Sequence, residues 1–122
     1  MLYPGDHLKF KGAFGYPSLY HHGVYVGNGT VVHFYAHNAK DKTNAEIQAI
    51  PLQQFIQLAA PHAVEKVQSL RPLLPRATIQ QRCLSKMGEK NYHVLLNNCE
   101  HFANWATTGE HRSYQVEAAL RR

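Results

Sequence analysis

Residues 19–34 read LYHHGVYVGNGTVVHF and contain the pattern that decides the fold. Two runs rich in β-branched and aromatic residues flank the pair Asn28-Gly29. Such a pair between two runs is a strong short-range signal for a β-hairpin, because Asn and Gly both tolerate positive φ angles. The stretch also carries three of the nine histidines, and the register of the hairpin decides which of them share a face of the sheet.

Two loop lengths are compatible with this hairpin. A two-residue loop, Asn28-Gly29, places His33 on the same face as His22, because side chains alternate along a strand. A three-residue loop, residues 27–29, places His33 on the same face as His21 instead. Its last position requires a positive φ, which glycine adopts without strain. The residues alone therefore leave both registers open.

The composition is that of a soluble protein. The 122 residues are enough to form one hydrophobic core, so we expect a single domain over residues 1–122. The net charge of +5 comes from dispersed lysines and arginines, which argues against a nucleic-acid partner and suits weak attraction to phospholipid headgroups. No apolar run approaches the ~18 residues of a membrane span. The first residues lack a secretory signal, so a cytoplasmic location is expected, and no pattern predicts an oligomeric state.

Predicted strands come mostly before predicted helices along the chain. Besides the hairpin, we expect strands at residues 5–12, 45–52 and 62–70 and helices at residues 52–59, 75–88 and 99–108. This order lacks the alternation of strand and helix that a parallel sheet requires. It indicates an α+β fold, an antiparallel β-sheet with packed helices.

The helix predicted at residues 99–108 carries a cysteine at its start. Asn98 is a favourable N-cap, and Gly109 is placed to end the helix. Cys99 would face inward, together with apolar residues three, four and seven positions further on. Backbone N–H groups and the helix dipole at this end favour a thiolate and can receive a developing oxyanion.

Two cysteines are too few for a disulfide framework, so both are expected as free thiols. Cys83 lies on the apolar stripe of its helix and is interpreted as a packing residue. Cys99 is compatible with two roles, a catalytic nucleophile or a small buried apolar residue. Its position alone does not decide between them, because a nucleophile also requires a partner base. His101 lies about 200° around the helix from Cys99, so a base must come from another element. No Cys or carboxylate recurs at a zinc-ligand spacing, and we expect neither a metal nor a cofactor.

Three motifs, in this order, resemble the lecithin–retinol acyltransferase (LRAT) family. They are HHGVYVG at residues 21–27, VVHF at residues 31–34 after an Asn-Gly turn, and LLNNCEHFANW at residues 95–105. DHL at residues 6–8 and LQQF at residues 52–55 fit the same family. The resemblance spans essentially the whole chain, and the three ordered motifs are highly specific together.

The resemblance implies a circularly permuted papain-like thiol enzyme of the NlpC superfamily, in which the histidines precede the cysteine. Matched position by position, the nucleophile is Cys99, the general base is His21, and the histidine that orients the base is His33. His22 falls on a variable family position and is expected to look outward. The resemblance therefore favours the three-residue loop, which also places Tyr25 on the His21 face as a supporting residue.

The implied chemistry is acyl transfer or hydrolysis through a thioester on Cys99, with an acyl ester or phospholipid as substrate and possible peripheral membrane contact. Eukaryotic members commonly carry a C-terminal membrane anchor, whereas this sequence ends in EAALRR, which favours a soluble acyl ester or a peptide amide. One alternative is an NlpC-type amidase or peptidase, whose work on cell walls would require an export signal. The other is a catalytically silent binding domain, which the presence of all three triad residues disfavours.

Overall fold

The chain forms an antiparallel sheet covered by helices in a computed structural model, which describes residues 1–13, 16–36, 44–94 and 97–121. The strands are β1 His7–Lys11, β2 Tyr20–Gly27, β3 Thr30–Tyr35, β4 Glu46–Pro51 and β5 Glu65–Lys66, and the helices are α1 Leu52–Ala59, α2 Arg76–Ser85, α3 Cys99–Thr108 and α4 Tyr114–Leu120. The strands pair antiparallel in the order β4-β3-β2-β1-β5. The predicted α+β class is confirmed.

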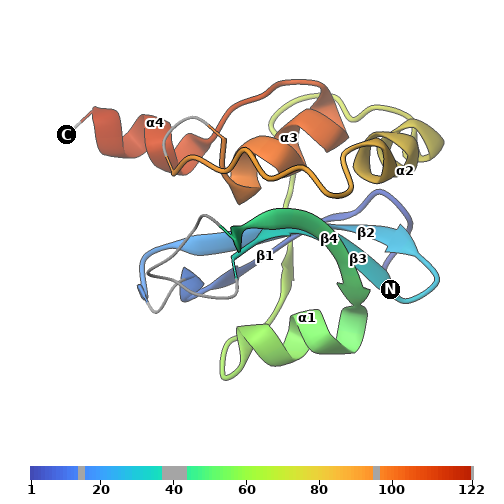
Figure 1. The fold of residues 1–122 in the computed structure, drawn as a ribbon, viewed down its shortest axis with the longest axis horizontal. Coiled ribbons are helices and arrows are strands. Elements are labelled where there is room, and N and C mark those ends of the chain that lie inside the picture. Colours follow the sequence, from blue (N-terminus) through green and yellow to red (C-terminus); the bar gives the residue numbers. More distant parts are fainter. Residues whose placement is uncertain (14–15, 37–43, 95–96, 122) are drawn as a thin grey trace.

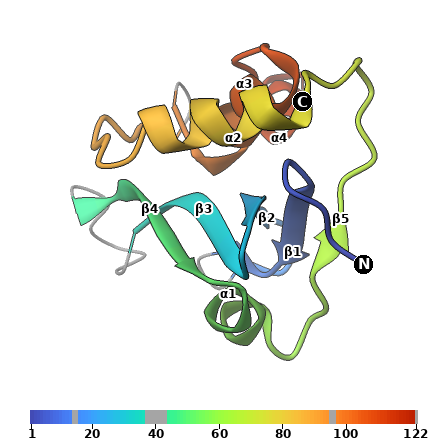
Figure 2. The same ribbon diagram turned by 90° about the vertical axis from the view of Figure 1, so that its right-hand side faces the viewer.

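Helices cover both faces of the sheet. Helix α1 lies against one face, whereas α2, α3 and α4 form a layer over the other (Figures 1 and 2). Each face has its own apolar core, because strand side chains alternate between the faces. Val24 and Val32 pack toward α3, and Val31 packs toward Phe55 of α1. The central strand β2 is therefore buried on both sides.

The β2–β3 hairpin combines features of both predicted registers. Asn28 and Gly29 form a two-residue turn with φ angles of 51° and 66°, and Gly27 pairs with Thr30. The predicted three-residue loop is therefore wrong. A bulge between Tyr25 and Gly27 then shifts the pairing by one residue, so that Val24 faces Val32.

The bulge shifts the pairing of β2 with β3 by one residue, as the three-residue loop would have done, so the same side chains share a face of the sheet. The Val26 carbonyl, which lies in the bulge, accepts a hydrogen bond of 2.7 Å from Nε2 of Gln80 in α2. This bond gives the carbonyl a partner outside the strand ladder. His21 and His33 consequently share the α1 face, as the three-residue register predicted, although the turn itself has two residues.

Helix α3 begins and ends as predicted. The Asn98 side chain accepts hydrogen bonds from the backbone N–H groups of Glu100 and His101, and the imidazole of His101 accepts one from the backbone N–H of Asn98. This reciprocal arrangement is a capping box. Gly109 ends the helix with a φ of 87°, which glycine adopts at little cost.

Two predicted elements are shorter in the structure. The strand expected at residues 62–70 is limited to Glu65–Lys66, which pair with the edge of β1. Helix α2 ends at Ser85, three residues before Gly88.

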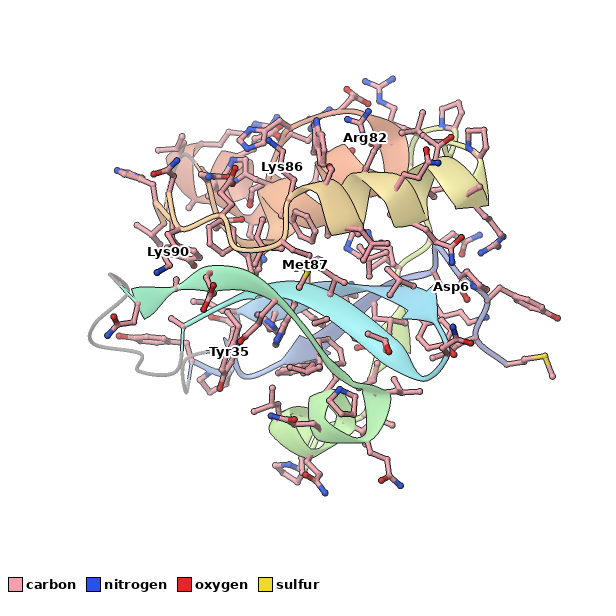
Figure 3. All side chains as sticks on the ribbon, turned by 45° about the vertical axis from the view of Figure 1, so that its right-hand side comes forward. Asp6, Tyr35, Arg82, Lys86, Met87 and Lys90 are labelled. Atoms are coloured by element: carbon pink, nitrogen blue, oxygen red, sulfur yellow. The ribbon has the colours of Figure 1, made fainter. Side chains whose placement is uncertain are left out.

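Arg82 and Lys86 lie over the ring of Trp105, 3.9 and 5.2 Å from its centroid, on the outer side of the helical layer (Figure 3). In the described part of the chain, no helix is long and apolar enough to cross a membrane.

Candidate active site

His21 and His33 form a buried pair on the face of the sheet that α1 covers. Nε2 of His21 lies 2.8 Å from Nδ1 of His33. The ring of Phe55 lies 5.9 Å from that of His21 and 5.7 Å from that of His33, and Tyr35 stacks on His33 at 4.9 Å. Burial in these aromatic surroundings lowers the pKa of His21 to about 4. His21 is therefore a neutral imidazole at pH 7.

Cys99 occupies the first turn of α3 on the other side of the sheet. It belongs to the same apolar core as Val24 and Phe34. The paired residues of β2 and β3 end at Val24 and Val32, and beyond this point the backbone N–H of His22 donates a hydrogen bond to the Cys99 sulfur. The sulfur thus lies where the two central strands separate.

The Cys99 thiol is protonated in the resting protein. Burial raises its pKa to about 11, and the nearby backbone N–H groups of His22, Glu100 and Cys99 itself oppose that change. The N–H groups at the helix start act in the predicted direction, but burial has the larger effect. Burial raises the pKa of Cys83 to about 12, and Cys83 packs in the core as predicted.

His22 does not look outward, and that prediction is wrong. Its side chain is 4 % exposed, and Nδ1 lies 2.7 Å from Nε2 of His7 in β1. The reason is the position of β2 in the centre of the sheet, where helices cover both faces. Two adjacent residues of such a strand always enter opposite cores, so the dipeptide His21-His22 places one histidine in each.

The structure therefore joins the predicted site residues only in part. It brings His21 and His33 together through their rings, and it places the His22 backbone at Cys99. Among the hydrogen bonds of the described residues, none joins the Cys99 sulfur to the His21 ring. Tyr25 faces α1 as expected, and its hydroxyl accepts a hydrogen bond of 3.1 Å from the backbone N–H of Gly29 in the turn.

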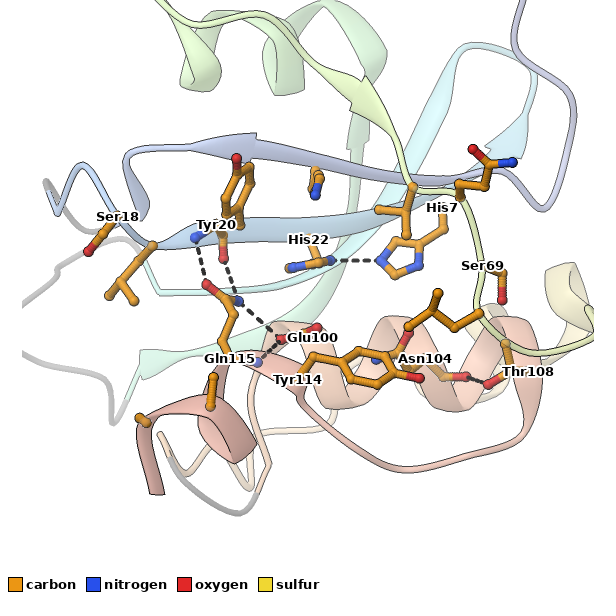
Figure 4. Close-up of a pocket in the computed structure, with 17 residues that line it drawn as sticks. His7, Ser18, Tyr20, His22, Ser69, Glu100, Asn104, Thr108, Tyr114 and Gln115 are labelled. Carbon is orange, nitrogen blue, oxygen red and sulfur yellow. Dashed lines mark hydrogen bonds between the residues drawn. The ribbon is translucent and has the colours of Figure 1, made fainter. Parts of the chain in front are cut away.

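A cavity of about 580 Å³ lies between the sheet and the helical layer, and Glu100 lines it, whereas the neighbouring Cys99 does not. Residues of β1, β2, α3, α4 and the segment 67–70 line it. His7 and His22 lie on one side, and Glu100, Asn104 and Thr108 of α3 lie on the other (Figure 4). The sequence reasoning missed both the cavity and the His7–His22 pair, because neither follows from the spacing of residues along the chain.

A buried carboxylate fixes one end of this cavity. Glu100 accepts hydrogen bonds of 2.8 Å from the Ser113 hydroxyl and of 3.1 Å from both the backbone N–H and Nε2 of Gln115. Gln115 also bonds the backbone N–H and carbonyl of Tyr20 at 2.8 and 3.2 Å. These bonds join the start of α3, the start of α4 and the start of β2 around the cavity.

The chain belongs to the lecithin retinol acyltransferase family, because the model of that family matches residues 1–112. No curated protein matches the chain. The match includes both histidine pairs and Cys99. Membership indicates activity of the acyltransferase or hydrolase type, which agrees with a thiol beside buried histidines.

Proposed function

We propose that the protein transfers an acyl group from an ester through a thioester on Cys99, with His21 as general base and His33 as the residue that orients it. The observation that carries this proposal is the buried His21–His33 hydrogen bond, which is 2.8 Å long. In the same chain, Cys99 lies at the start of α3, and the backbone N–H of His22 lies near its sulfur. A base held by a second group, together with a thiol at a helix N-terminus, is the arrangement that thiol acyl transfer requires.

The first step starts from neutral partners. With a pKa of about 11 for Cys99 and about 4 for His21, the thiol keeps its proton until substrate arrives. In the tautomer in which the Nε2–H of His21 donates a hydrogen bond to Nδ1 of His33, Nδ1 of His21 carries the lone pair that a base needs. The contact between this base and the thiol then forms in the substrate complex, where β2 and β3 separate, because catalytic hydrogen bonds often tighten only in the complex.

The bonds made and broken follow from these roles. The Cys99 sulfur bonds to the ester carbonyl carbon while His21 takes the thiol proton. The oxyanion lies against the backbone N–H of Cys99 at the start of α3, because the Asn98 side chain already accepts the N–H groups of Glu100 and His101. His21 returns the proton to the departing alkoxide, and the acyl group stays on the sulfur. A hydroxyl compound or water then attacks the thioester and releases the thiol.

The substrate class follows from the family and the charge. We propose an acyl ester of the phospholipid type, because the family acts on acyl groups and the net charge of +5 favours an anionic lipid surface. A soluble acyl ester would react through the same three residues, Cys99, His21 and His33. The reaction would then not require a lipid surface.

Incubation with p-nitrophenyl butyrate, followed by intact-mass measurement, tests the proposal. One butyryl group is expected on Cys99, and Cys99→Ser should remove it, whereas Cys83→Ser should retain it. His21→Gln should slow acylation about 10²- to 10⁴-fold, which is the usual contribution of a general base. His62 is exposed and serves as the matched control. In the His62→Gln variant, Cys99 should be acylated at the same rate as in the unmodified protein. Acylation of Cys83 at the rate of Cys99 would contradict the proposal.

A further inference from the structure

One carboxylate oxygen of Glu100, a residue that lines the cavity, has no partner among the residues that the structure describes. Glu100 is 4 % exposed, and the three hydrogen bonds that it accepts from Ser113 and Gln115 all end on Oε1. No described residue donates a hydrogen bond to Oε2 or forms an ion pair with this carboxylate. Because a buried charge is costly unless it is paired, a cation in the cavity is stabilised at Oε2.

Asn104 offers a second acceptor one turn further along α3. It is 7 % exposed, and its Nδ2 donates a hydrogen bond of 3.0 Å to the carbonyl of Arg112. This bond fixes the orientation of the amide and leaves Oδ1 without a donor among the described residues. Glu100 and Asn104 are four positions apart, so they lie on the same face of the helix, and both line the cavity (Figure 4).

The His7–His22 pair adds a third acceptor from the wall that the sheet forms. The two residues are 7 % and 4 % exposed, and the hydrogen bond between them is 2.7 Å long. Burial, followed by a neighbouring histidine, lowers the pKa of both residues, so the pair is neutral at pH 7. The bond uses one nitrogen of each ring, and of the two remaining nitrogens one carries a proton and the other accepts. Either choice of tautomers therefore leaves one acceptor for the cavity.

Three acceptors and one buried negative charge match a primary ammonium group, which carries three N–H donors. A hydroxyl group donates only once, and a carboxylate is repelled by Glu100. Lys9 lines the cavity, but its amine lies over the ring of Tyr20, 4.4 Å from the centroid. Val67 and Leu70 add apolar surface to a cavity of about 580 Å³, which is in the usual range of small-molecule sites. The cavity thus suits a short alkyl chain that ends in an ammonium group.

We propose that this cavity binds a small alkyl amine in its protonated form, with the ammonium group held by the free oxygens of Glu100 and Asn104 and by the histidine pair. Cys99 does not line the cavity, and the amine is a bound ligand, not an acyl acceptor. The inference is independent of the proposed acyl transfer. It gives the His7–His22 pair a function, for which the proposed mechanism has no use.

Occupation of the site reaches Cys99 through Glu100, the next residue in the chain. Burial is the main cause that raises the pKa of the Cys99 thiol, and the negative charge of Glu100 raises it further. A bound ammonium group offsets that charge, so a larger fraction of Cys99 is thiolate in the complex. The ligand thereby increases the reactivity of the thiol without contacting it.

A titration of the unmodified protein at pH 7 tests binding. With ¹⁵N-labelled histidines, hexylamine should give saturable shifts of the His7 and His22 ring nitrogens. 1-Hexanol and hexanoate should bind more weakly. Hexyltrimethylammonium keeps the charge but has no N–H donor, so it should bind about tenfold more weakly. No saturable shift with hexylamine, a shift confined to His21 and His33, or equal or tighter binding of any of the other three compounds would overturn the proposal.

Two substitutions change the charge at the site in opposite directions. Glu100→Gln keeps the size of the side chain and removes its charge, so the affinity for hexylamine should fall about 10- to 100-fold. Lys9→Gln removes a positive charge from the cavity lining and should raise the affinity, and it tests the site even where Glu100→Gln does not fold. His62→Gln is the matched control, with the affinity of the unmodified protein. An unchanged affinity in Glu100→Gln, or an unchanged or lower one in Lys9→Gln, would contradict the site.

The rate at which iodoacetamide alkylates Cys99 at pH 7 tests the effect on the thiol. Saturating hexylamine should raise this rate about threefold, which corresponds to a pKa change of about half a unit. Cys83 does not line the cavity and should react at an unchanged rate. An unchanged or lower rate at Cys99 would overturn the link between the site and the thiol. None of these measurements requires an acyl-enzyme, so a failure of the proposed function is distinguishable from a failure of this inference.

Discussion

At the scale of single residues, Gly23 shows how closely the histidine pairs are packed. It lies between His21 and Tyr25 on the α1 face of β2. A Cβ atom at this position would lie 2.9 Å from Cε1 of Phe55 and 2.9 Å from Cγ1 of Val31. Both contacts are shorter than ordinary van der Waals distances, so any larger residue must displace the core around the His21–His33 pair.

We therefore expect Gly23→Ala to lower the free energy of unfolding by about 1–3 kcal/mol, the usual cost of overpacking a core. Urea denaturation measures this change. Val31→Ala removes one of the two clashing atoms, so the double variant should be more stable than the sum of the single changes predicts. Strict additivity of the two substitutions would show that the clash is relieved in another way.

At the scale of elements, the start of α3 places the nucleophile. The side chain of Asn98 accepts the N–H groups of Glu100 and His101, and this cap fixes the turn in which Cys99 lies. The same turn holds the Glu100 carboxylate that bonds Ser113 and the start of α4. A single cap thus supports both the thiol and one wall of the cavity.

Asn98→Ala should cost about 1 kcal/mol of unfolding free energy, because it removes the acceptor of two backbone N–H groups. It should also lower the rate of Cys99 acylation, since the N–H groups around the sulfur lose their orientation. Asn98→Asp keeps an acceptor oxygen and is the matched control, with most of the stability expected to remain. Equal losses in the Ala and Asp variants would indicate that the amide group, rather than the cap, is what the site requires.

At the scale of the whole molecule, the sheet holds a buried histidine pair on each face. His7, His21 and His22 all have pKa values below the usual 6.5, with burial as the main cause. An unfolded chain binds protons on these residues as the pH falls below about 6.5, whereas the folded protein does not. Acid therefore favours the unfolded state.

Stability should be full above about pH 6.5 and decrease as the pH falls toward 4, by up to ~1.4 kcal/mol per pH unit for each such histidine. Urea midpoints at pH 7, 6 and 5 measure the effect. His7→Gln removes one of these groups and should give a shallower decrease than the unmodified protein, whereas His62→Gln removes only an exposed histidine. A free energy of unfolding that does not change between pH 7 and 5 would be inconsistent with lowered pKa values of His7, His21 and His22.

Local patterns in the sequence were sufficient for the elements and for the faces of some residues. The Asn28-Gly29 turn, the start of α3 at Cys99 and the amphipathic helix α1 all follow from interactions between residues close in the chain. The family motifs added the three site residues. The bulge between Tyr25 and Gly27 did not follow, and its Val26 carbonyl bonds Gln80 of α2, a residue far away in the chain.

The sequence by itself determined an α+β protein with two central strands, two adjacent histidines on one of them, and a cysteine at the start of a late helix. Only the tertiary structure decided that both faces of β2 are buried, so that His22 pairs with His7 instead of facing water. It also decided that Cys99 remains a thiol, because burial outweighs the helix N-terminus. Both outcomes depend on which layers cover the sheet, and this information lies in contacts between distant segments.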